Sequence, residues 1–427
     1  MNKVLFLLVS FLCAIMFFAK FFFLVSENSS DFYLLAVIEL ISIVVLFGWS
    51  IFSFITSEKV KKMRPSRTRF SLPVIILATL CITLLVSSFI QTSVTNSLDW
   101  DAVALYDARA KFLLDGVKFS EMKSLTSFDF KNGYYYSLYP PFTSILHFGW
   151  YRFGIPAPVP VLYSLFLVMF ATGIFLMLHP RLGISWSLLA TFIVIGQQNL
   201  FSTSIIAYSN LPYTLYLSLG ILFLHRYLID KKNWYLGFGI ILVMSSQWIR
   251  FLEPSWLIVV ISFAAISWKS LSLRRTIIPA ILLTASCIIS YVSWKYFAEV
   301  VSQKETIFQT SLLNFLEPVL GIFTGSLLII SIAYLKMWGG TLIIYIGSII
   351  AALNLQDEEA KADLFLVFLI VLSFSMYFFG LYFISFQFEW WPEMGGSLLR
   401  SSTFLLPVAV YLLTKATKQI FKNKTKI

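Results

Sequence analysis

The chain has 427 residues, of which 59% are hydrophobic and only 12% are charged, and its mean hydropathy is +0.83. This composition excludes a soluble globular protein. The net charge of +11 does not indicate nucleic-acid binding, because the basic residues gather in short loops between apolar runs, as they do in cytoplasmic loops of membrane proteins.

Apolar runs of membrane-spanning length recur from one end of the chain to the other. A bilayer core needs about 20 apolar residues per helix, so the sequence predicts an all-α polytopic membrane protein, one domain over 1–427, with roughly 10 to 13 transmembrane helices. The first predicted helix is interpreted as an uncleaved span rather than a signal peptide. The predicted spans cover about 4–25, 32–55, 70–91, 158–178, 184–206, 211–229, 234–252, 254–268, 276–297, 315–335, 338–354, 364–386 and 397–414. A short run at 142–153 is interpreted as a half-helix or as part of a broken one.

Loop charge predicts the orientation of these spans. The loop 58–69 carries six Lys or Arg and is expected inside, so the polar segment 92–142 is expected outside. The basic loop 225–233 and the lysine-rich tail are also expected inside. If every later run crossed once, the tail would fall outside. We therefore expect the stretch 298–336, which begins as a polar amphipathic segment, to lie along the surface or to re-enter.

The segment 92–142 is the predicted extracytoplasmic catalytic loop. It holds six of the 21 acidic residues of the chain, and a short amphipathic helix is predicted in it that ends at Leu114, with Gly116 in the stop position. Asp99 can cap this helix and Asp101 lies in its first turn, where the helix dipole favours the ionised carboxylate that a general base needs. Two interpretations of both carboxylates stand: chemistry, or capping alone.

Other features of this loop have simple structural interpretations beside functional ones. Asp107 and Lys111 are spaced i, i+4 and are expected to pair. Tyr139-Pro140-Pro141 is typical of a helix start. The tyrosines near it suit an interfacial belt, a surface for stacking on a sugar or the wall of a lipid-entry groove.

Polar residues recur where later apolar runs meet the same predicted face. They are Gln197, Asn199, Tyr208, Asn210, Arg250, Glu253 and Arg400. Ionisable residues at a membrane edge are functional candidates by default. The alternatives are a structural ion pair between Arg250 and Glu253, and snorkelling of Arg400 to lipid headgroups. A carboxylate near arginines suits glycosyl transfer from a lipid phosphate, because the leaving phosphate needs cations and the acceptor hydroxyl needs a base.

The segment WDAVALYDARAKFLLDG followed by YPP resembles the first outer loop of bacterial GT-C glycosyltransferases of the family 39-like group, which use polyprenyl-phosphate sugars. The matching residues are Trp100, Asp101, Ala102, Tyr106, Arg109, Ala110, Lys111, Tyr139, Pro140 and Pro141. Later matches are Arg250 with Glu253 in RFLEP and Ser397 with Arg400. The segment YSNLP departs from the pattern, since Asn210 stands where the group often has an acid.

The resemblance implies a GT-C-like fold, Asp101 as catalytic base and a loop helix that lies flat on the membrane. It also implies a donor phosphate held by arginine or lysine. The expected substrate-binding residues are Asp99, Trp100, Tyr106, Arg109, Lys111, Tyr139, Pro140, Asn210, Arg250, Glu253 and Arg400. Some relatives use a divalent metal, Mg or Mn, for which Asp99 and Asp101 would be the ligands here. The three cysteines lie in apolar runs and are expected to be free buried thiols.

The sequence therefore predicts a glycosyltransferase in a bacterial plasma membrane, with its active site on the extracytoplasmic face. It would move a sugar from a polyprenyl-phosphate donor to a glycan, lipid or protein acceptor. The alternatives are a flippase or transporter of lipid-linked sugars, which should place charges near the midplane, and a catalytically inactive GT-C-like assembly partner.

Overall fold

The computed structural model describes residues 2–27, 30–58, 71–94, 102–122, 139–251, 254–270, 273–302, 326–355, 357–386 and 391–424. Within these ranges the chain forms helices and no strand. Seven helical segments are long and apolar enough to cross a membrane, and a bent pair adds an eighth if it counts as one span. The predicted all-α, multi-pass membrane class is therefore confirmed.

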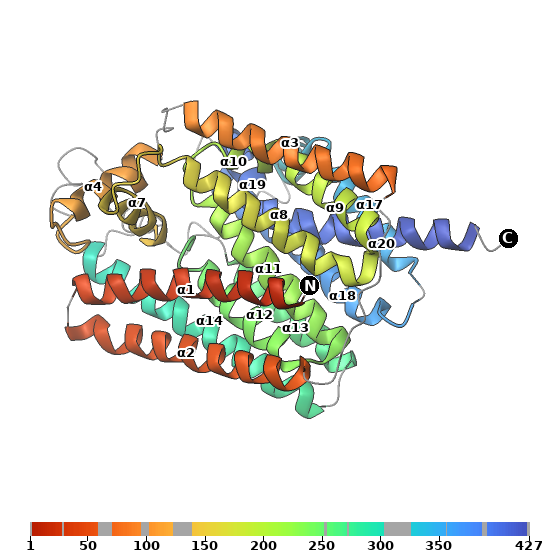
Figure 1. Ribbon diagram of the computed structural model, residues 1–427, viewed down its shortest axis with the longest axis horizontal. Helices are drawn as coiled ribbons and strands as arrows, with labels where there is room; N and C mark the ends of the chain where they lie inside the picture. Colours follow the sequence, from red (N-terminus) through yellow and green to blue (C-terminus); the bar gives the residue numbers. More distant parts are fainter. Residues whose placement is uncertain are drawn as a thin grey trace.

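The long helices run side by side along one axis, and shorter helices complete the bundle (Figure 1). The long ones are α1 (Asn2–Glu27), α2 (Ser30–Glu58), α3 (Leu72–Val94), α8 (Val161–Leu182), α11 (Asn210–Asp230), α14 (Leu273–Ser302), α18 (Ala360–Ser385) and α20 (Leu406–Lys424). The shorter ones are η1 (Ala102–Asp107), α4 (Ala108–Leu114), α7 (Phe142–Arg152), α9 (Ile184–Gly196), α10 (Gln198–Thr203), α12 (Asn233–Ser246), α13 (Ser255–Ser270), α16 (Ser326–Trp338), α17 (Thr341–Leu353), η2 (Trp391–Met394), α19 (Gly395–Ser401) and η3 (Ser402–Leu405).

The predicted spans agree with these helices in position and differ in some details. The run 184–206 is broken into α9 and α10 at Gln197, which caps α10 by accepting a bond from the Leu200 amide at 3.0 Å. The run 142–153 is the short helix α7, which follows the predicted start at Pro140 and Pro141. The expected number of roughly 10 to 13 spans included α9, α11, α12 and α13. These helices are shorter or more polar than the seven that are long and apolar enough to cross a membrane.

The bundle has two distinct ends. The helices α4 and α7 lie together at one end, here called the island end, and the C-terminus of α20 lies at the other, here called the opposite end (Figure 1). At the island end, the Glu27 carboxylate accepts bonds from the Phe119 and Ser120 amides at 2.6 and 3.1 Å. The C-terminal end of α1 is thereby held against the segment that follows α4.

The position of the lysine-rich tail follows from contacts at the opposite end. Asp363, near the start of α18, binds both His225 of α11 and Lys415 of α20, at 2.9 and 2.6 Å. The tail and the loop 225–233 therefore lie at the same end of the bundle, as loop charge predicts. The helices α16 and α17 meet at an angle of 93° across Gly339–Gly340 and form one bent pair.

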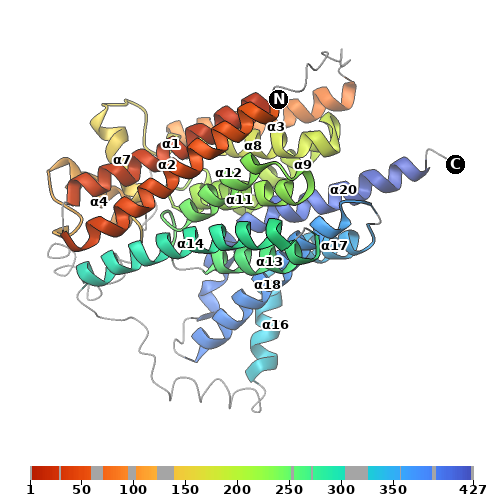
Figure 2. The same cartoon turned by 90° about the horizontal axis from the view of Figure 1, so that it is seen from below.

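Figure 2 shows α16 leaving the bundle to one side. The predicted runs 315–335 and 338–354 are thus not two straight spans. Residues 303–325, which include most of the expected surface or re-entrant stretch, lie outside the described residues.

Candidate functional site

The helix predicted in the catalytic loop is present and ends where the sequence indicates. It starts as a π-helical turn, η1, and continues as α4 to Leu114. The Gly116 amide donates to the Leu113 carbonyl at 3.2 Å and the Val117 amide donates to the Phe112 carbonyl at 2.9 Å. This pair of bonds is a Schellman motif, and Gly116 supplies the positive φ of 83° that it requires.

The residues predicted to carry the chemistry directly precede this helix. Asp99, Trp100 and Asp101 lie outside the described residues, so the base and the metal ligands stay predictions. The first described residue after them, Ala102, begins η1 and is fully buried.

Arg109 fixes the loop helix to the start of α7. Its side chain is buried, and both terminal guanidinium nitrogens donate to the Tyr139 carbonyl at 3.0 Å. The guanidinium also lies over the Phe119 ring, 5.5 Å from its centroid. Arg109 is one of the expected substrate-binding residues, and through these contacts it holds the main chain at Tyr139.

Asp107 is the hub of a buried polar group between the loop helix and α7. Its carboxylate is 1% exposed and pairs with the Lys111 ammonium at 2.8 Å, which confirms the predicted i, i+4 pair. The Tyr151 hydroxyl donates to the same carboxylate. The His147 Nδ1 lies 3.8 Å from it. Lys111 keeps 62% of its side chain exposed, so its ammonium lies between the buried carboxylate and the surface.

His147 extends this group into the bundle. Its Nε2 and the Tyr163 hydroxyl of α8 are hydrogen-bonded at 2.8 Å, while Nδ1 has no hydrogen-bond partner among the described residues. Burial lowers the pKa of His147 to about 4, and the nearby Asp107 offsets only part of that shift. Burial and the bond to Asp107 raise the pKa of Tyr151. At neutral pH the imidazole is therefore uncharged and the Tyr151 hydroxyl is a proton donor.

Tyr106 links the loop helix to the start of α11. Its hydroxyl is hydrogen-bonded to the Ser209 hydroxyl at 2.8 Å, and its ring meets the edge of the Tyr139 ring at 6.2 Å. Asn210, the next residue, is the first of α11 and is 3% exposed. The loop helix and the YSNLP segment, about a hundred residues apart in the chain, are thus in direct contact.

Arg250 and Arg400 meet at α19. The Arg250 guanidinium donates to the Ser401 hydroxyl at 3.0 Å, and the Arg400 guanidinium donates to the Ser397 hydroxyl at 3.4 Å. Arg400 also lies over the Tyr208 ring, 5.3 Å from its centroid. Tyr208 adjoins Ser209, which is hydrogen-bonded to Tyr106. Side-chain contacts therefore connect four separate segments of the predicted site. Glu253, the expected partner of Arg250, lies outside the described residues.

A narrow crevice adjoins this cluster. It brings the α9–α10 junction and the α16–α17 break against α19 and η3, and its lining residues are Gln197, Asn199, Trp338, Thr341, Tyr345, Leu399, Ser402, Thr403 and Leu406. The predicted polar residues Gln197 and Asn199 therefore lie close to the helix that carries Arg400. The broken pair α16–α17 forms one wall beside it.

A second polar network, at the opposite end, has no counterpart among the predicted site residues. Lys415 pairs with Asp357, Glu359 and Asp363, while Arg181 pairs with Asp230 and Glu359. His225 and Arg226 add bonds to Asp363 and Asp230. The carboxylates are mostly buried and each has a basic partner, so the network ties α8, α11, α18 and α20 together. The sequence signals for it are the acidic segment 357–363 and Asp230 in the basic loop 225–233.

Metal ligation has no support within the described ranges. No group of three or more His, Cys, Asp or Glu lies together there, and the two expected ligands are outside those ranges. The cysteines Cys13, Cys81 and Cys287 are free and buried, as predicted. Comparisons with protein-family models, curated proteins and solved structures return no match for this chain.

Proposed function

We propose that this protein is a GT-C-like glycosyltransferase of a bacterial plasma membrane. It transfers a sugar from a polyprenyl-phosphate donor to a glycan, lipid or protein of the cell envelope. The observation that carries the proposal is the convergence of the loop helix, the YSNLP segment, Arg250 and Arg400 at one end of the bundle. These are the segments in which the sequence resembles that group.

The proposed reaction is a direct displacement with inversion. The acceptor oxygen bonds to the anomeric carbon as the bond from that carbon to the phosphate oxygen breaks. Polyprenyl phosphate leaves with the electron pair, and Asp101 takes the proton of the acceptor hydroxyl. Arg250 and Arg400 bind the phosphate, whose charge grows as it leaves. Arg109 and Asp107 hold the loop helix in place.

Loop charge supports an extracytoplasmic site. The basic segments 58–69, 225–233, 269–275 and the tail all join helices at the opposite end, so that end is cytoplasmic by the positive-inside rule. The island end then faces outward. This orientation is compatible with a lipid-linked donor presented on the outer leaflet.

A transporter of lipid-linked sugars is the second candidate, because an ion pair is buried between two helices of spanning length. Lys20 of α1 pairs with Glu39 of α2, both about 2% exposed, and the Lys20 ammonium lies 4.5 Å from the centre of the Trp248 ring. Intramembrane charges of this kind often mark transport paths. The groove of about 460 Å³ between α3, α8 and α9 lies on the flank of the bundle, and neither Lys20 nor Glu39 lines it.

The test is sugar transfer from radiolabelled polyprenyl-phosphate sugars to a native membrane extract. Wild type should transfer label, and Asp101→Asn should lose activity by about 10²- to 10⁴-fold, as expected on removing a general base. Asp115→Asn, an exposed carboxylate at the end of the same helix, is the matched control and should stay active.

Two results would count against the proposal. Full transfer by well-folded Asp101→Asn would remove Asp101 from the mechanism. Donor binding by wild type without transfer of any sugar would favour the transporter or a catalytically inactive assembly partner.

A further inference from the structure

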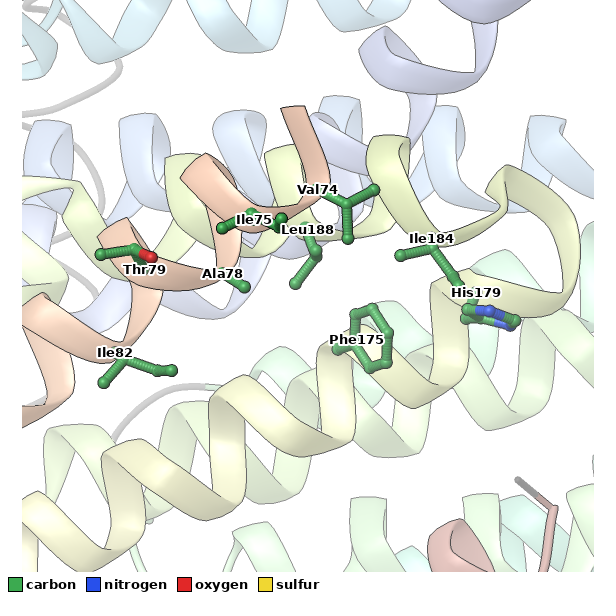
Figure 3. A pocket seen from close by; sticks show the side chains of 9 residues that line it. All are labelled: Val74, Ile75, Ala78, Thr79, Ile82, Phe175, His179, Ile184 and Leu188. Carbon is green, nitrogen blue, oxygen red and sulfur yellow. The ribbon is translucent and has the colours of Figure 1, made fainter. Parts of the chain in front are cut away.

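An apolar groove runs along the flank of the bundle in the half nearer the opposite end. It encloses about 460 Å³ and is lined by Val74, Ile75, Ala78, Thr79, Ile82, Phe175, His179, Ile184 and Leu188. Figure 3 shows the side chains of α3 on one side and those of α8 and α9 on the other, with Ile82 towards one end and His179 at the other. It is separate from every residue of the candidate site.

The groove follows from how these three helices meet. Gly183, at a φ of +77°, forms a tight turn that folds α9 back along α8. The helix α3 packs against both of them. Where it crosses them it presents the small side chains of Ala78 and Thr79, which leave space that a larger residue would fill.

The surroundings of the groove identify the class of molecule that occupies it. Both α3 and α8 are long enough to span a membrane, and Ile75 and Ile82 at the rim are 52% and 59% exposed. The groove therefore opens sideways into the bilayer. Water in it would find few polar partners, which makes hydration of the groove unfavourable. A hydrocarbon chain fills such a space at no polar cost.

The His179 end of the groove is polar and basic. The Nδ1 atom of His179 is buried and has no hydrogen-bond partner among the described residues. The Lys418 ammonium donates to the Arg181 carbonyl at 2.8 Å. Within the described chain, Lys418 makes no ion pair with a carboxylate. The ring contact between Trp186 and Phe421, with centroids 5.9 Å apart, holds α20 beside the start of α9.

We propose that the groove binds one chain of an anionic phospholipid from the leaflet at the opposite end, with the phosphate beside His179 and Lys418. The apolar walls take the hydrocarbon, and the uncompensated ammonium and the imidazole nitrogen take the headgroup. A zwitterionic lipid supplies the hydrocarbon chain but carries no net negative charge for the ammonium. The proposal does not depend on transferase activity and stands or fails separately from it.

Native mass spectrometry of the detergent-purified protein tests the site, with phosphatidylglycerol and phosphatidylcholine of matched chains as probes. Ala78→Trp fills the groove and should weaken binding of both lipids by at least about tenfold, since one side chain of this size replaces the buried hydrocarbon contacts. Ile76→Trp is the matched control, an exposed apolar position of the same helix outside the groove, and should bind as wild type. Thr79→Phe provides a second filling variant at an exposed position if Ala78→Trp fails to fold.

The headgroup is tested by Lys418→Gln. Loss of one lysine at a membrane surface should weaken phosphatidylglycerol binding by about fivefold and leave phosphatidylcholine binding unchanged. Lys361→Gln, an exposed lysine at the start of α18, should change neither. Wild-type binding by both groove-filling variants would overturn the site. Equal binding of the two lipids, unaffected by Lys418→Gln, would overturn the anionic ligand.

Discussion

Acidification should destabilise this protein through His147. The imidazole is fully buried, and burial lowers its pKa from 6.5 to about 4 although the Asp107 carboxylate lies close by. Between these two values the unfolded chain binds a proton that the folded chain does not bind. The free energy of unfolding therefore falls as the pH falls from about 6.5 to about 4, and His147 contributes no further change below that. Each pH unit is worth up to about 1.4 kcal/mol, which gives a total of about 3 kcal/mol.

The measurement is the free energy of unfolding in one detergent from neutral pH down to about pH 4, for wild type and His147→Gln. Glutamine can still bond to the Tyr163 hydroxyl but does not titrate. Carboxylates that protonate in this range contribute to both curves and cancel in the difference. We expect the wild-type curve to fall more steeply, by about 3 kcal/mol over the range. Parallel curves would refute the reasoning and would mean that His147 is hydrated or already charged.

Three further predictions concern stability. Lys415→Met leaves the buried Asp363 carboxylate without its ammonium partner and should lower the free energy of unfolding by about 3 to 5 kcal/mol. The control is Lys361→Met at an exposed position, which should stay within about 0.5 kcal/mol of wild type in the same denaturation assay. Tyr106→Phe removes the hydrogen bond to the start of α11 and should cost about 1 kcal/mol; an unchanged midpoint would mean that this contact is not formed in the membrane. Gly116→Ala places a β-carbon at a positive φ and should cost about 1 kcal/mol, with faster proteolysis after α4 as the readout, and an unaltered digestion rate would contradict it.

Local sequence signals predicted much of the island end. The length and apolarity of the runs predicted the helices, since a span needs a continuous apolar stretch. The end of the loop helix was predicted from Gly116, and the pair of Asp107 with Lys111 from helical spacing. Charge asymmetry between loops also placed Arg250 and Arg400 at the same end, where both now contact α19.

The contacts that the sequence did not predict depend on tertiary packing. The proximity of His147 to Asp107 is one of them, because no local pattern in the chain indicates that α7 turns this histidine towards Asp107. The bend between α16 and α17 was missed, since the apolar runs 315–335 and 338–354 were counted as two spans, whereas α16 and α17 are long enough for one span only when taken together. Arg109 carried the charge expected of a phosphate ligand, yet burial against Tyr139 gives it a main-chain partner.

The gathering of the candidate site at one end has a physical cause. In a helical membrane protein, irregular backbone is tolerated where water can reach it, so functional loops form at the ends of the bundle. Because successive helices alternate in direction, every second connection emerges at the same end. Connections of one parity include those before η1, before α11, after α12 and before α20. Asp101, Asn210, Arg250 and Arg400 lie in these connections or directly beside them. The connections of opposite parity carry the basic loops and the network around Lys415. The bundle thereby separates the candidate site from the basic loops, and a variant that moved a basic cluster to the island end would be expected to change the topology of the protein in the membrane.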